Sequence, residues 1–161
     1  MSIELPLYKQ NKDNTCALAC LRMVLAAYGR HVPESELEAQ ARMELQGTRI
    51  DELERLARQF QLGAEIQETT VEELRGILAQ GKLPILYIDR LVFELSPGQR
   101  ARHSIRDAII HTVIPTQVTA RSVTFHDPRL PQITRKSMRL FRQAFSSLGG
   151  HCIVCSKPVE T

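Results

Sequence analysis

The sequence has no long apolar run, few aromatic residues and only a small excess of positive charge. Its most apolar stretches, around residues 83–88 and 109–115, are far shorter than the roughly 20 residues that cross a bilayer. The first ten residues lack the basic start and apolar stretch of a signal peptide. We therefore expect a cytoplasmic protein with no membrane span of its own. In that reducing compartment its four cysteines should be thiols and not a disulfide framework.

Nucleic-acid binding is not indicated by the composition. The formal net charge of +3 is too small to argue for a nucleic-acid partner by itself. Arginine and lysine gather at residues 100–106 and 135–142, but aromatic residues do not interleave with them in the manner of a base-stacking platform. We interpret these basic groups as solvated faces and predict no nucleic-acid partner.

The chain reads as a single domain over residues 1–161. Hydrophobic residues make up 43% of it and charged residues 24%, values typical of a globular protein. There is no repeat, low-complexity segment or linker that would divide it. A chain of this length can bury one substantial core.

Apolar spacing and turn residues predict helices in the first half and strands in the second. The predicted helices cover about 15–29, 33–43, 48–63 and 70–81, with a last one over 136–145. The predicted strands are 83–89, 109–115, 122–127 and 152–156. The polar stretch 90–107 is expected to be an insertion or loop beside the sheet. This order indicates an α+β domain, with N-terminal helices packed on an antiparallel sheet.

Cys16 is the first candidate for chemistry. It stands at the predicted start of the first helix, where unpaired N–H groups and the helix dipole stabilise an anion. Such a position lowers the pKa of a thiol, and the thiolate is the species that attacks. From position alone, a buried structural cysteine remains the alternative.

Three further residues could complete a catalytic set with Cys16. His111 opens an apolar strand and is the type of side chain that can take a proton from a thiol near neutral pH. Asp127 could fix the tautomer of that histidine, and the Gln10 amide could donate to an oxyanion. Each has a structural alternative: a histidine with satisfied hydrogen bonds at a strand end, an aspartate starting a turn before Pro128, and an ordinary surface amide.

The order of these residues resembles that of the bacteriocin-processing peptidases, papain-like cysteine peptidases that cut leader peptides after a double glycine. The matching segments, in chain order, are Gln10 to Met23, Tyr28-Gly29, Gly47 to Leu53, Leu62-Gly63, Pro84-Ile85, His111 to Ile114 and Asp127-Pro128. The resemblance covers almost the whole chain. It implies a papain-like fold without a cofactor, with Cys16 as nucleophile, His111 as base, Asp127 as orienting group and Gln10 as oxyanion donor.

Two features differ from the family pattern. Ala17 follows the candidate nucleophile where the family usually has glycine, and its methyl group would narrow the substrate cleft. The chain also contains no Walker-type Gly-Lys-Ser/Thr loop, so it resembles the peptidase-like domain alone. The expected partner is a peptide or protein substrate, and a separate transporter or partner protein remains open.

Other candidates are weaker. Cys20, one turn beyond Cys16, is expected to pack in the core. Cys152 and Cys155 form a C-x-x-C pattern, but a strand points them to opposite faces, so no metal site is predicted. Asp89 is expected to face solvent at a strand end. Leu148-Gly149-Gly150 resembles a double-glycine cleavage signal, yet a turn before the last strand is the better interpretation.

Three hypotheses follow. The leading one is a thiol hydrolase that cleaves a peptide bond in a leader peptide or another peptide. A second is a catalytically inactive peptidase-like module that binds a peptide or protein partner. A third keeps the same triad for deamidation or acyl transfer, because an acyl-enzyme can be resolved by different nucleophiles.

Overall fold

The computed structural model describes residues 4–130 and 132–158. A six-stranded antiparallel sheet runs through the molecule in the order β1-β6-β2-β3-β4-β5. The strands are β1 (Gly63–Glu68), β2 (Leu83–Asp89), β3 (Ile110–Val118), β4 (Ser122–His126), β5 (Ile133–Ser137) and β6 (His151–Ser156). The helices are α1 (Cys16–Ala27), α2 (Glu34–Gln40), α3 (Ile50–Gln59), α4 (Val71–Ala79), α5 (Leu91–Glu94), α6 (Pro97–Arg102) and α7 (Met138–Ser146), with a 3-10 turn, η1 (Ile105–Asp107). The predicted α+β class is confirmed.

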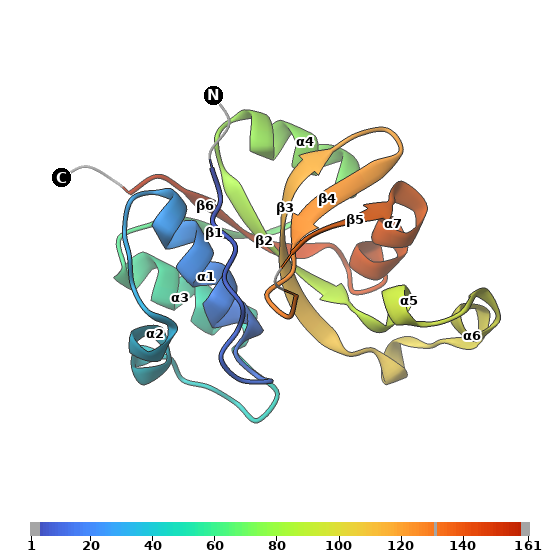
Figure 1. The fold of residues 1–161 in the computed structure, drawn as a ribbon, viewed down its shortest axis with the longest axis horizontal. Coiled ribbons are helices and arrows are strands. Elements are labelled where there is room, and N and C mark those ends of the chain that lie inside the picture. The colour runs from blue at the N-terminus through green and yellow to red at the C-terminus, as the bar shows by residue number, and fades with distance from the viewer. Residues whose placement is uncertain (1–3, 131, 159–161) are drawn as a thin grey trace.

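Helices cover both faces of the sheet and create two hydrophobic cores (Figure 1). Helices α1 and α3 pack against one face, and α4 and α7 against the other. Strands β2 and β6 contribute to both cores: Ile85 and Cys155 lie in the first, and Leu86 and Cys152 in the second. A central strand buried on both faces cannot alternate apolar and polar residues, and this explains the continuous apolar runs in these two strands.

Helix α1 is buried on almost every side. Cys20 is buried as predicted, and so are five apolar residues of the same helix: Leu18, Leu21, Met23, Val24 and Leu25. Each fully buried leucine or methionine contributes roughly 1.5–3 kcal/mol relative to an exposed one. The helix therefore acts as a rigid support for the residue at its N-terminus, Cys16.

Two strands and three short helical segments were not predicted from the sequence. Strand β1 lies within the region expected to be a helix end and a turn, and β5 precedes the last helix. Both are edge strands, and β5 alternates between exposed and half-buried residues, so neither carries a strong apolar pattern. Within 90–107, expected to be a loop, the chain forms α5, α6 and η1.

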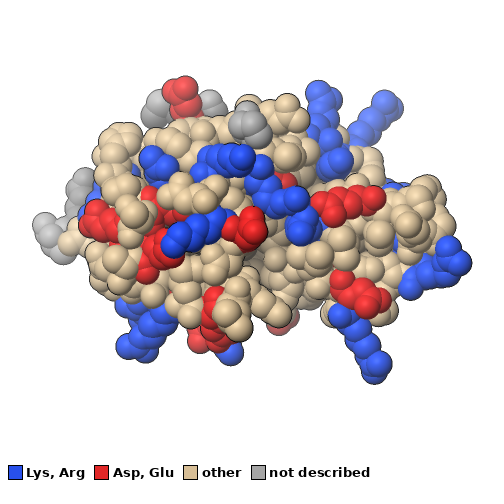
Figure 2. Space-filling view, turned by 60° about the horizontal axis from the view of Figure 1, so that its bottom comes forward, with Lys and Arg blue, Asp and Glu red and all other residues tan. Residues whose placement is uncertain are grey.

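The charged surface is mixed. Figure 2 shows basic side chains interspersed with acidic ones on the face it presents, without one large patch of a single sign. Among the described residues, no helix is both long enough and apolar enough to cross a membrane.

Candidate active site

Cys16, His111 and Asp127 come from three different elements that meet at one end of α1. Cys16 is the first residue of α1, and α1 packs against β3, which carries His111. Asp127 directly follows β4, the antiparallel neighbour of β3. Because Ile114 pairs with His126, the chain that continues past His126 runs beside the start of β3. This register places Asp127 next to His111.

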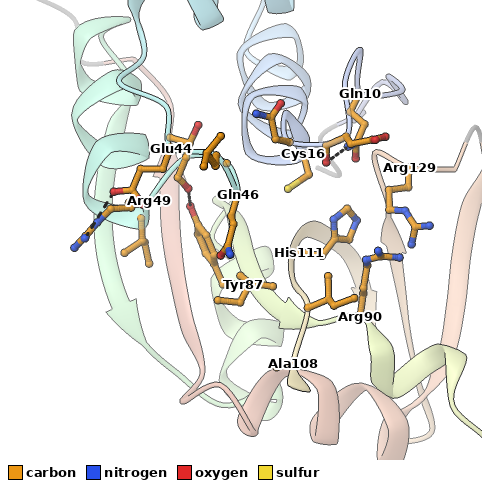
Figure 3. Close-up of a pocket in the computed structure, with 18 of the residues that line it drawn as sticks. Gln10, Cys16, Glu44, Gln46, Arg49, Tyr87, Arg90, Ala108, His111 and Arg129 are labelled. Carbon is orange, nitrogen blue, oxygen red and sulfur yellow. Dashed lines mark hydrogen bonds and ion pairs between the residues drawn. The ribbon is translucent and has the colours of Figure 1, made fainter. Parts of the chain in front are cut away.

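His111 lies between the other two side chains of the site, bonded to Asp127 and facing Cys16. His111 Nε2 lies 2.6 Å from Asp127 Oδ1. Because Nε2 is bound to Asp127, Nδ1 is the ring nitrogen that remains for Cys16, whose pKa is lowered by His111. Figure 3 shows the Cys16 sulfur directed toward the His111 ring. The structure thus brings together three of the four predicted site residues in the predicted order.

The hydrogen bonds favour an ionised sulfur and a protonated imidazole. Burial by itself raises the pKa of Cys16, but the hydrogen bond from His111 and the charge of that ring bring the pKa below its ordinary value. For His111, burial opposes protonation, yet the bonds to Asp127 and Cys16 raise the pKa. The pKa of Asp127 is lowered, because its bond to His111 outweighs the effect of burial.

The other three thiols have the opposite environment. Burial raises the pKa of Cys152 and of Cys155 to about 12. Burial also raises the pKa of Cys20 well above its ordinary value, and its Sγ lies 3.6 Å from Thr112 Oγ1. These three cysteines are core residues, as predicted for Cys20. Cys16 is the cysteine that is only partly buried.

The first turn of α1 offers free N–H donors beside the sulfur. The first hydrogen bond of the helix runs from Ala19 N–H to the Thr15 carbonyl (2.9 Å). The N–H groups of Cys16, Ala17 and Leu18 therefore have no carbonyl partner in the helix. The Thr15 hydroxyl does not cap them, because it bonds to Lys12 backbone atoms instead.

Gln10 lies near the cysteine, but its amide is engaged. Its backbone N–H donates to Pro128 O (2.7 Å), which joins the loop before α1 to the segment that follows Asp127. Its side-chain Nε2 donates to Lys12 O (2.7 Å) and Asp13 O (3.1 Å), while its Oε1 is buried without a hydrogen-bond partner among the described residues. The structure brings Gln10 to the site without a free amide hydrogen.

The site opens into a cavity of about 1160 Å³ that Cys16, His111, Tyr87, Arg49, Arg90 and Arg129 help to line (Figure 3). Ala17 is buried in the first core and is not one of the described residues that line the cavity. The expectation that its methyl group narrows the cleft is wrong, because on a buried helix the residue after Cys16 points toward the core. Asp13 and Glu44 are the acidic residues of the lining.

Asp89 is a second correction, since it is buried and not exposed to solvent. Its Oδ1 accepts the backbone N–H groups of Leu91 and Ile109 (3.1 Å each). Its Oδ2 lies 2.5 Å from Nε2 of His103. Both ends of the 90–107 segment are therefore tied to one carboxylate beside the site.

The double glycine forms a turn that ends α7, as predicted. Gly149 and Gly150 both have positive φ (92° and 70°), and Gly150 N–H returns to the Phe145 carbonyl. Cys152 and Cys155 lie in different cores, on opposite faces of the sheet. Within residues 4–130 and 132–158, no three His, Cys, Asp or Glu side chains lie close enough together to hold a metal ion.

Sequence reasoning missed Thr112, Arg90 and Arg129. Thr112 Oγ1 accepts a hydrogen bond from the Cys20 thiol, and Thr112 helps to lower the pKa of Cys16. Arg129 N–H donates to Asp127 Oδ1 (2.9 Å). Two of them could have been found from the sequence, because Thr112 is adjacent to His111 and Arg129 is adjacent to Asp127-Pro128. Nothing in the sequence relates Arg90 to His111 or Asp127.

Comparison with a family profile finds a match to the peptidase C39 family over residues 4–93. The matched residues, more than half of the chain, include Gln10 and Cys16. His111 and Asp127 lie beyond them. Comparison with curated proteins finds no match.

Solved structures share the fold over nearly the whole chain. One is a double glycine motif protease from an AMS/PCAT transporter in complex with the leader peptide (TM-score 0.74, 19% identity, 98% of this chain and 94% of that one). Another is a C39-like peptidase from Bacillus anthracis (TM-score 0.75, 17% identity, 98% of this chain and 96% of that one). A third is the peptidase domain of Streptococcus ComA, a bi-functional ABC transporter involved in a quorum-sensing pathway (TM-score 0.73, 17% identity, 96% of this chain and 99% of that one). The papain-like fold expected from the sequence is confirmed.

Proposed function

Because this chain belongs to the peptidase C39 family, we propose that it is a cysteine peptidase that cleaves a peptide bond in a leader peptide or another peptide. Cys16 is the nucleophile, His111 the general base and acid, and Asp127 the group that orients His111. The observation that carries this proposal is the 2.6 Å bond between His111 Nε2 and Asp127 Oδ1, on a ring toward which the Cys16 sulfur is directed (Figure 3). A buried structural cysteine has no need of a histidine that is itself held by a carboxylate.

The reaction begins from a thiolate and an imidazolium. The Cys16 sulfur attacks the substrate carbonyl carbon, and the carbonyl electrons move to its oxygen. When the tetrahedral intermediate collapses, the C–N bond breaks and His111 gives its Nδ1 proton to the departing amine. A water molecule then loses a proton to His111 and attacks the thioester. The released carboxylic acid leaves Cys16 as thiolate and His111 protonated, ready for another cycle.

The oxyanion is stabilised by the first turn of α1. The free N–H groups of Cys16 and Ala17, together with the positive end of the helix dipole, stabilise negative charge there. Gln10 joins them by giving up one of its two present contacts. The bond to Asp13 O is the longer of the two, at 3.1 Å, and is the easier one to exchange for a substrate oxygen.

The substrate is a peptide that binds in an extended conformation. A cavity that is open to solvent and of about 1160 Å³ has room for several residues on either side of the cut. A solved relative of this fold holds a leader peptide, which makes leader peptides the first class to test. A free thiolate at Cys16 persists in a reducing compartment such as the cytoplasm. A separate transporter is the proposed protein partner.

The test compares wild type with Cys16→Ala and Cys20→Ala. In one reaction each protein is incubated with iodoacetamide at pH 7, and in a separate reaction, without iodoacetamide, with a library of leader peptides. The products of both reactions are identified by mass spectrometry. We expect rapid alkylation of Cys16 and cleavage by wild type and by Cys20→Ala, and neither with Cys16→Ala. Cys20→Ala is the matched control because it removes a thiol from the same helix.

Product masses also separate the other uses of the triad. Peptide cleavage splits the substrate in two, whereas deamidation adds about one dalton to an intact peptide. If Cys16 reacts no faster than free cysteine and no peptide changes, the catalytic proposal fails. A peptide that binds equally well to wild type and Cys16→Ala without any product would indicate the binding module instead.

A further inference from the structure

Two arginines lie on the wall of the cavity that carries His111. Arg90 directly precedes α5, and Arg129 follows Asp127-Pro128 after β4. Both contact the same atom, Glu94 Oε1, at 2.9 Å and 3.0 Å. Figure 3 shows both side chains beside His111, with Glu44, Gln46, Arg49 and Tyr87 on the other side of the cysteine. The proposed reaction does not use either arginine.

Their positions correspond to the leaving-group side of the cleft. His111 must give its proton to the departing nitrogen, so the part of the substrate that follows the cut runs past His111. Arg129 is fixed there by its backbone N–H, which donates to Asp127 Oδ1. Arg90 is fixed by its own N–H, which donates to Ile109 O (3.0 Å).

The two guanidinium groups share one ion-pair partner. Within the described residues, the side chains of Arg90 and Arg129 both pair with the single carboxylate of Glu94, so guanidinium hydrogens remain that this carboxylate does not bind. Glu94 is 45% exposed and Arg129 is 40% exposed, and ion pairs this exposed add little stability. A second carboxylate can therefore bind to the free guanidinium hydrogens, or displace Glu94, at small cost.

We infer that Arg90 and Arg129 form a carboxylate-binding subsite for the substrate residues that follow the cut. The ligand is either an Asp or Glu side chain or the free C-terminal carboxylate of the substrate. This inference rests on the proposed peptidase function, because that function defines the leaving-group side. It adds a preference that the triad alone does not contain.

The first test needs no known substrate. Iodoacetate and iodoacetamide alkylate the same sulfur and differ in one negative charge, so the ratio of their rates at Cys16 measures the local preference for a carboxylate. We expect this ratio to fall about threefold or more in Arg90→Gln and Arg129→Gln and to rise in Glu94→Gln, with all differences shrinking at high salt. Arg49→Gln is the control, because Arg49 lines the opposite part of the same cavity.

The second test identifies the source of the carboxylate. Wild type is given a mixture of peptides of random sequence, with either free or amidated C-termini, and the cut sites are read by mass spectrometry. Enrichment of Asp or Glu at the first positions after the cut indicates a side-chain ligand. Cuts confined to the last residues of peptides with free C-termini indicate the terminal carboxylate. Either preference should fall about tenfold in Arg129→Gln, as expected for loss of one charge-assisted hydrogen bond.

The outcomes separate this inference from the peptidase proposal. A ratio in Arg90→Gln, Arg129→Gln and Glu94→Gln that is the same as in wild type, or cut sites without any acidic or terminal preference, would overturn the carboxylate subsite while leaving the peptidase intact. Fast alkylation that responds to Arg90 and Arg129 without any peptide cleavage would support the subsite and overturn the peptidase. Loss of iodoacetamide reactivity in a variant would reveal misfolding, and Arg90→Met and Arg129→Met would then repeat the test with the charge removed and the length of the side chain largely kept.

Discussion

His111 and Asp127, far apart in the sequence, share a hydrogen bond of 2.6 Å between Nε2 and Oδ1. Both side chains are largely buried, so water cannot easily replace either partner. The same Asp127 oxygen also accepts the Arg129 N–H. A carboxylate held in this way fixes both the rotation of the imidazole and the nitrogen that faces Cys16.

Asp127→Asn should preserve the shape of the site but remove its negative charge. We expect peptide cleavage to slow by about 10²–10⁴-fold, because the imidazolium loses the partner that raises its pKa. On the alkaline side, cleavage should also be lost at a lower pH than in wild type. The measurement is the pH profile of the cleavage rate. Asp107→Asn, an exposed aspartate in η1, serves as control, and an unchanged profile in Asp127→Asn would contradict the orienting role.

The pH dependence should differ between alkylation and cleavage. Alkylation of Cys16 by iodoacetamide should rise with pH around a midpoint below the ordinary thiol value of 9.0, because His111 lowers the pKa of Cys16. Cleavage needs the imidazole proton as well, so it should fall again as the pH passes the raised pKa of His111, above 6.5. The alkylation rate should therefore rise with pH to a plateau, whereas the cleavage rate should follow a bell-shaped curve.

His111→Gln isolates the contribution of the imidazole to this profile. Burial then remains as the main influence on Cys16 and raises its pKa. The alkylation midpoint should move upward, above the ordinary thiol value. A midpoint that stays where it is in wild type would show that His111 does not ionise the sulfur.

Asp89→Ala should destabilise the fold. Asp89 accepts two backbone N–H groups and contacts His103, so its loss leaves buried donors without partners. We expect the free energy of unfolding to fall by about 3 kcal/mol, measured by urea denaturation. Asp51→Ala is the control, because Asp51 is 68% exposed and forms an exposed ion pair with Arg49; its change should stay within about 0.5 kcal/mol. Equal effects of the two substitutions would contradict the tie between Asp89 and the 90–107 segment.

Gly150→Ala and Gly76→Ala should change stability in opposite directions. Gly150 has φ of 70°, and an added Cβ would collide with the Thr69 carbonyl oxygen, so alanine there should cost more than about 1 kcal/mol. Gly76 lies within α4 with open space around an added Cβ, and alanine there should stabilise by about 0.5–1 kcal/mol. Thermal unfolding of both variants measures the difference. A neutral Gly150→Ala would contradict the turn geometry at the end of α7.

Much of the fold and of the candidate site follows from local sequence. The apolar spacing of α1, the continuous apolar runs of β2 and β6, and the Gly149-Gly150 turn each reflect short-range chemistry. The residue types Cys16, His111 and Asp127 were identifiable because few side chains can serve as nucleophile, base and orienting group. Their roles remain predictions until the variants are measured.

Tertiary structure decided what depends on long-range pairing. Edge strands β1 and β5 exist because a neighbouring strand offers free backbone groups, and their own side chains carry little signal. Asp89 is buried because it satisfies donors from both ends of the 90–107 segment, which no local pattern reveals. Arg90 and Arg129 meet at Glu94 only because α5 folds beside the end of β4. The sequence by itself determined which groups could react, since the reactivity of a side chain depends first on its residue type. The packing of α1 against β3 determined which of these groups meet, since the distances between residues far apart in the sequence are set by the tertiary fold.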